Sequence, residues 1–96
     1  MIRLSVKDIA GVQCGTEREG LLLYKSLAPL LIVADAIELD FDGVELASSS
    51  FFNASIGCAF TEFGEKYVRD SISYVGVNPR VWFVLDRTLS SYAEAV

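Results

Sequence analysis

The sequence has 96 residues, of which 52% are hydrophobic and 22% charged, so it predicts one small domain with a hydrophobic core rather than a disordered chain. Its mean hydropathy of +0.40 is high for a domain of this size and is consistent with some apolar surface facing a partner. The formal net charge of −5 argues against nucleic acid as a partner, because phosphate contacts need clustered Lys and Arg and the basic residues here are scattered.

The first predicted element is a half-buried strand. Apolar Ile2, Leu4 and Val6 alternate with polar residues, which is typical of such a strand and unlike a signal peptide. The longest apolar run, residues 27–34, contains a proline and is too short to span a bilayer. We therefore expect a cytoplasmic domain without membrane contact.

A helix follows a glycine-rich loop, in which Val12 belongs either to a second short strand or to the turn that follows it. Thr16 and Glu19 have the spacing of a capping box, which stabilises a helix start by about 1 kcal/mol. Leucines then recur at helical spacing. Pro29 lacks a backbone N–H, so we expect the helix to cover about residues 17–28 and to kink or end there.

The next elements are a strand and a turn. Residues 36–41 place Ile37, Leu39 and Phe41 on one face and acidic side chains on the other. Residues 42–43, Asp-Gly, are typical of a turn.

A second, strongly apolar helix is predicted to begin at Ser49 or Ser50 and to run to Phe63. Gly57 lies within it at a cost of about 1 kcal/mol relative to alanine, and we expect it to allow close approach to a strand. Gly64 is expected to end the helix. The predicted core stripe is Phe52, Ile56, Ala59, Phe60 and Phe63.

The C-terminal part predicts a third main strand and a last helix. Residues 65–70 are a charged connection of about one helical turn, and residues 72–75 form the strand. Asn78 and Pro79 start a helix, with Asn as the cap and Pro at the first helical position. The apolar stripe of this helix is expected at Trp82, Leu85, Leu89 and Tyr92.

Strands that alternate with helices predict an α/β fold with right-handed crossovers. We expect a single domain over residues 1–96 with a mixed β-sheet of about four strands. Because the strand at residues 36–41 has one polar face, the helices should lie mainly on one face of the sheet.

Little of the sequence points to catalysis. It contains no histidine, which excludes histidine general bases and the usual catalytic triads. Cys14 and Cys58 are interpreted as reduced thiols. Asp40, Asp42 and Glu45 have the chemistry to bind a divalent cation, but we favour the interpretation that Asp40 and Asp42 end the strand and shape the turn. We predict no metal, no cofactor and no enzymatic activity.

Three consecutive serines, Ser48, Ser49 and Ser50, stand at the start of the second helix. One of them is expected to cap the helix, and a phosphate on one of them would add a charge of about −1.5 to −2 at a helix start, which tolerates negative charge. The junction is therefore a candidate one-residue switch on a partner-binding surface. The expected partner contacts are Asp42, Gly43, Glu45, Phe51 and Phe52.

The sequence around these serines resembles a known family. Leu-Asp-Phe-Asp-Gly-Val at residues 39–44 and Ser-Ser-Ser-Phe at residues 48–51 resemble the prokaryotic STAS-like family of unknown function. Residues 18–20, Arg-Glu-Gly, and residues 77–78, Val-Asn, also fit, and the resemblance extends from about residue 2 to residue 92. It implies one STAS-like domain.

More distantly, the chain is similar to the STAS domains of anti-sigma factor antagonists. These carry Asp-Ser-Ser-Gly at the same junction, and a partner kinase of the histidine-kinase-like ATPase fold phosphorylates the first serine. Ser49 matches that serine, whereas Ser48 replaces the aspartate and Phe51 the glycine. The resemblance implies a non-catalytic regulatory module that docks on a protein partner.

Three hypotheses about function remain open at this point. The first is a partner-switching regulator that a histidine-kinase-like ATPase binds and phosphorylates. The second is a constitutive docking module, for example a homodimer. The third is a sensor of a small ligand or nucleotide that uses the same helix N-terminus as an anion site.

Overall fold

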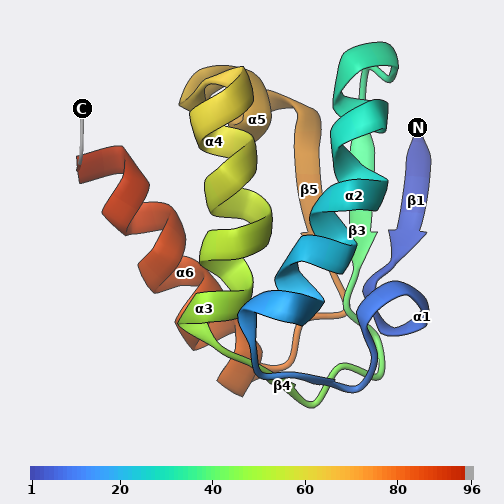
Figure 1. Ribbon diagram of the computed structural model, residues 1–96, viewed down its shortest axis with the longest axis vertical. Coiled ribbons are helices and arrows are strands. Elements are labelled where there is room, and N and C mark those ends of the chain that lie inside the picture. Colours follow the sequence, from blue (N-terminus) through green and yellow to red (C-terminus); the bar gives the residue numbers. More distant parts are fainter. Residues whose placement is uncertain (95–96) are drawn as a thin grey trace.

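The computed structural model describes residues 1–94, which form a small α/β domain (Figure 1). In chain order its elements are β1 (Ile2–Ser5), α1 (Val6–Ala10), β2 (Gln13–Cys14), α2 (Glu17–Val33), β3 (Ile37–Asp40), β4 (Leu46–Ala47), α3 (Ser49–Phe52), η1 (Asn53–Gly57), α4 (Cys58–Phe63), α5 (Glu65–Ser71), β5 (Ile72–Val75) and α6 (Pro79–Glu94). The expected one-turn connection at residues 65–70 is thus a helix, α5. Within residues 1–94, no helix is long and apolar enough to cross a membrane.

The main sheet has three parallel strands in the order β1-β3-β5, with Ile37 of β3 paired with Ile2 and Ile72. The remaining two strands, β2 and β4, form a separate parallel pair of two residues each. The prediction of an α/β fold is therefore confirmed. The difference from about four strands in one mixed sheet is small, and it arises because β2 and β4 pair with each other.

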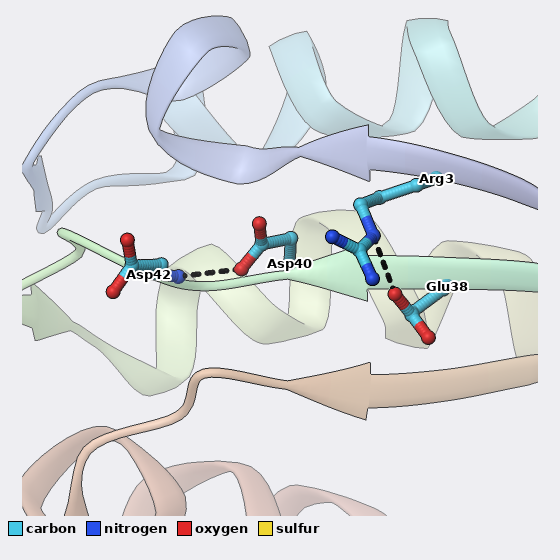
Figure 2. Close-up of polar contacts among 4 residues, drawn as sticks. All are labelled: Arg3, Glu38, Asp40 and Asp42. Carbon is cyan, nitrogen blue, oxygen red and sulfur yellow. Dashed lines mark hydrogen bonds and ion pairs between the residues drawn. The ribbon is translucent and has the colours of Figure 1, made fainter.

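The helices lie mainly on one face of the main sheet, as predicted. On that face Ile37 and Leu39 are fully buried. On the other face Arg3 forms an ion pair with Glu38 of the neighbouring strand (Figure 2), and the helices lie behind the strands in this view. Alternation along β3 thus separates an apolar, covered face from a polar, open one.

Two helix starts form as the sequence predicts. The carboxylate of Glu19 accepts hydrogen bonds from the backbone N–H of Thr16 at 2.8 Å and from its hydroxyl at 2.7 Å. At the start of α6, the backbone N–H of Val81 donates to Asn78 Oδ1 at 2.8 Å. Both contacts satisfy helix ends that would otherwise lack partners.

Pro29 does not end α2, contrary to the expected boundary at residue 28. The helix continues to Val33 with Pro29 inside it. Pro29 and Lys25 both lie on the exposed side, so the Lys25 carbonyl that loses its donor is open to water. Leu27 and Leu31 are fully buried and hold the helix against the core on either side of the proline. Burial therefore outweighs the missing hydrogen bond.

The second predicted helix is present over its whole length, but its middle, η1, is a π-helix. The Ser55 hydroxyl, which is buried, donates to the carbonyl of Phe51 at 2.8 Å within this stretch. Gly57 allows close approach to α6 and not, as expected, to a strand. A Cβ at Gly57 would lie 2.2 Å from the hydroxyl oxygen of Tyr92. Gly64 ends the helix with a φ of +90°, as expected.

The buried face of α6 differs from the predicted stripe. Val81 and Leu85 are fully buried and Thr88 nearly so, at the i, i+4, i+7 spacing of one helix face. Trp82 is 46% exposed and Phe83 63% exposed, so the prediction that Trp82 belongs to the core is wrong. The 3-4-3 spacing in the sequence fits both faces, and packing against the core selects the one that contains Val81.

Candidate functional site

The junction between β4 and α3 is fixed by Ser48, which caps α3. Its Oγ accepts a hydrogen bond from the backbone N–H of Phe51 at 3.1 Å and donates one to the carbonyl of Gly15 at 3.0 Å. Its own N–H donates to the carbonyl of Cys14 at 3.0 Å. The Ser48 hydroxyl is thus committed to structure, and this serine is the cap that the sequence left unassigned.

Ser49 and Ser50 are both exposed, but they line two different clefts. A cleft of about 320 Å³ between α3–η1 and α6 is lined by Ser49, Asn53, Val84, Arg87, Thr88 and Ser91. A second cleft of about 300 Å³, between α2 and the α3–η1–α4 helix, is lined by Glu17, Leu21, Ser50, Asn53, Ala54 and Cys58. We call these the α6 cleft and the α2 cleft.

The two clefts differ in charge. Among the described residues that line the α6 cleft, the one charged side chain is Arg87. Among those that line the α2 cleft, it is Glu17. The guanidinium carbon of Arg87 lies 5.8 Å from the centre of the Phe83 ring. The three ion pairs found within residues 1–94 do not include Arg87. Ser49 therefore shares its cleft with a cation that forms no ion pair among the described residues, and the sequence pattern around Arg87 did not predict this placement.

The predicted turn at Asp42 and Gly43 is present and exposed. Gly43 has a φ of +84°, and the backbone N–H of Asp42 donates to Asp40 Oδ1 at 2.9 Å (Figure 2). A Cβ at Gly76 would lie 2.8 Å from the Asp42 nitrogen, and a Cβ at Gly43 would lie 2.7 Å from Lys7 Cδ. Close packing on both sides therefore holds the turn in place.

Asn78 connects the same region to α6. Its Nδ2 donates to the carbonyl of Val44 at 3.0 Å, while its Oδ1 caps the helix through Val81. Glu45 is exposed, and its Oε1 accepts a hydrogen bond from Gln13 Nε2 at 3.2 Å. The sequence predicted the capping role of Asn78, but not its second bond to the loop before β4.

Phe51 and Phe52 are core residues. Their burial confirms the place of Phe52 in the predicted core stripe and corrects the expectation that the two side chains contact a partner. Both are fully buried. The ring centres of Phe51 and Phe52 lie 5.1 Å apart, and those of Phe41 and Phe52 lie 6.0 Å apart. These two side chains anchor α3 in the core, so the exposed surface of the junction comes from Ser49, Ser50, the turn and the partly exposed Leu46 of β4.

Asp40, Asp42 and Glu45 do not gather into a cation site. In the part of the chain that the structure describes, no group of three or more acidic or cysteine side chains is placed to hold a metal ion. Asp40 accepts a hydrogen bond from the backbone of Asp42, as the favoured interpretation of the strand end implies, whereas Glu45 accepts one from Gln13.

The two cysteines have different environments. Cys14 is fully buried, and its thiol donates to the carbonyl of Gly11 at 3.3 Å. Burial, and secondarily the negative charge of Glu19, raises the pKa of the Cys14 thiol to about 11 from an ordinary value of 9.0. Cys58 is partly exposed and lines the α2 cleft.

We expect iodoacetamide at pH 8 to modify Cys58 and leave Cys14 intact, because alkylation requires an accessible thiolate. Intact-mass spectrometry should show one adduct in the native protein and two after denaturation in urea. Two adducts formed at equal rates in the native protein would contradict the burial of Cys14.

The raised pKa of Cys14 also predicts how the free energy of unfolding depends on pH. The contribution of this thiol is fully present below about pH 9 and declines as the pH rises toward about 11, because the unfolded chain loses this proton first.

The fold and the junction define the class of protein: a small α/β domain with a one-sided parallel sheet and exposed serines at a strand-to-helix junction. Residues 19–82 match the family model described as a STAS-like domain of unknown function, and the chain belongs to this family. Neither a curated protein nor a solved structure matched the chain.

Proposed function

We propose that this STAS-like domain is a non-catalytic docking module whose protein partner binds at the β4–α3 junction and is released when Ser49 is phosphorylated. The observation that carries the proposal is the different use of the three serines. Ser48 is committed to the cap, which leaves the hydroxyl of Ser49 exposed at a helix start that the two hydrogen bonds of Ser48 hold in place. An exposed hydroxyl at this position is accessible to a kinase and to a partner alike.

Charge supplies the reason for release. Asp42 and Glu45 are exposed on the loop that leads to Ser49, and the chain carries a net charge of −5. A phosphate adds about −1.5 to −2 at pH 7. A partner surface that fits the neutral hydroxyl would then meet an additional dianion, which costs binding free energy through desolvation and like-charge contacts.

The partner that this proposal favours is a histidine-kinase-like ATPase, which would both bind the junction and phosphorylate it. The support is the resemblance of residues 48–51 to the phosphorylated junction of anti-sigma factor antagonists, together with the STAS-like family. Phosphorylation needs ATP, so the proposal places the domain in the cytoplasm. The proposal assigns no cofactor and no metal to this domain itself.

The proposal predicts a partner that wild-type bait captures and that Ser49→Asp bait does not. Tagged proteins would be incubated with extract of the native host, and the captured proteins identified by mass spectrometry. Ser50→Asp is the matched control, because Ser50 is also exposed but lines the α2 cleft. We expect Ser50→Asp to retain the partner. A partner captured equally by wild-type and Ser49→Asp baits would contradict the switch.

A second candidate function is a constitutive homodimer. The apolar side chains of the predicted helix at residues 49–63 are largely buried in the fold, but Trp82 and Phe83 leave a different apolar surface exposed on α6. This hypothesis predicts a dimer in sedimentation equilibrium that Phe83→Ala weakens and Ser49→Asp leaves unchanged. The switch predicts no such dimer.

A further inference from the structure

We infer that Arg87 binds the phosphate on Ser49 within the same molecule, so that phosphorylation closes the α6 cleft. This inference rests on the proposed function, because it assumes that Ser49 is the modified residue. Ser49 lines one wall of the cleft and Arg87 the other. A phosphate bound between them would connect α3 directly to α6.

Arg87 is available for this role. Its guanidinium lies over the Phe83 ring and takes part in none of the ion pairs found in residues 1–94. A guanidinium that stacks on a ring keeps its N–H groups free at its edge, and phosphate is the anion whose geometry fits that edge with two parallel hydrogen bonds. The stacking therefore orients Arg87 without occupying its donors.

The other lining residues are compatible with an anion. Asn53 and Ser91 are exposed and offer an amide and a hydroxyl donor. The hydroxyl of Thr88 already donates to the carbonyl of Val84 at 3.0 Å. No acidic side chain is among the described residues that line this cleft, so nothing on its walls opposes a dianion.

The neighbouring serine provides the contrast. A phosphate on Ser50 would face the α2 cleft, where the charged residue is Glu17. Like charges repel, so the structure offers a binding site for a phosphate on Ser49 and an unfavourable environment for one on Ser50. The two serines are adjacent in sequence, and Arg87 is what distinguishes them.

The test uses ³¹P NMR to measure the pKa of the second ionisation of the phosphate while the pH is raised. Phosphoserine would be incorporated genetically at position 49 or at position 50, so the result does not depend on any kinase. A nearby cation stabilises the dianion and lowers the pKa from its ordinary value of about 6. We expect Arg87→Gln to raise the pKa of phosphoserine at 49, strengthening proton binding about three- to tenfold for this exposed pair. The pKa of phosphoserine at 50 should not change.

Arg80→Gln is the matched control, because it removes the same charge from an exposed position on α6 outside the cleft. Far-UV circular dichroism would establish that each variant is folded. An effect of Arg87→Gln no larger than that of Arg80→Gln would overturn the inference. That result would leave the proposed switch standing if Ser49→Asp still loses its partner. Conversely, equal capture by Ser49→Asp would remove the switch without affecting a measured Arg87–phosphate pair.

Discussion

Replacing Gly20 with alanine is expected to destabilise the domain by about 2 kcal/mol. A Cβ at this position would lie 2.4 Å from the carbonyl oxygen of Phe51 and 2.7 Å from Ala54 Cβ. Overpacking typically costs about 1–3 kcal/mol and more where the obstacle is backbone, and the better helix propensity of alanine returns only about 1 kcal/mol. Urea denaturation followed by circular dichroism would measure the change in the free energy of unfolding.

Gly15→Ala is the control for this prediction. A Cβ at Gly15 would lie 3.9 Å from Leu46 Cδ2, which is an ordinary contact. We expect its effect to be within about 0.5 kcal/mol of zero. If Gly20→Ala were as stable as the wild type, α2 and α3 would not be in the close contact described. The close contact also gives a physical reason for glycine in the Arg-Glu-Gly segment of the family resemblance.

Replacing Phe52 with alanine should lower the free energy of unfolding by about 3–5 kcal/mol. The side chain is fully buried and its ring packs on those of Phe41 and Phe51. A small domain is typically stable by about 5–15 kcal/mol, so this loss is a large fraction of the total. Urea denaturation, monitored by circular dichroism, would measure the free energy of unfolding of this variant relative to the wild type.

The comparison variant is Phe83→Ala, which removes the same side chain from a position that is 63% exposed. Its cost should be about 1 kcal/mol or less. Equal costs for the two variants would show that Phe52 is not part of the core. In that case the original expectation, that Phe52 contacts a partner, would stand again.

Much of the fold could be predicted because it depends on local patterns. Alternation in residues 36–41 predicts β3, and the side chains of Glu19 and Asn78 each accept a hydrogen bond from a backbone N–H three residues away at the start of their helix. Such contacts involve neighbours in the sequence, so their residue types alone identify them. The turn at residues 42–43 could be predicted for the same reason, because its Asp-Gly pair is itself typical of a turn.

The predictions that the structure contradicts concern contacts between distant segments. Pro29 lies inside a helix because burial on both sides holds the helix together. Gly57 faces Tyr92, and the stripe of α6 contains Val81 rather than Trp82. In each case a local preference was compatible with two arrangements, and packing against another element selected one of them.

At the candidate site, too, local patterns could be predicted and contacts between distant segments could not. The sequence places three serines at a helix start, and any of them could act as its cap. Only the fold assigns the cap to Ser48 and directs Ser49 and Ser50 into clefts of opposite charge. Arg87 could not be found from its neighbours, since it reaches the site through the packing of α6 on α3. Burial likewise decided that Phe51 anchors the site instead of facing a partner.

The most direct test of the account is the phosphate occupancy of Ser49 in the protein as its host makes it. Tagged protein at native abundance would be separated by gel filtration into free and partner-bound fractions, and its phosphopeptides quantified in each. The account predicts phosphate on Ser49 in the free fraction and at least about tenfold less in the bound one, equivalent to about 1.4 kcal/mol of binding free energy. Equal occupancy in the two fractions, phosphate on Ser50 instead, or no bound fraction at all would contradict it.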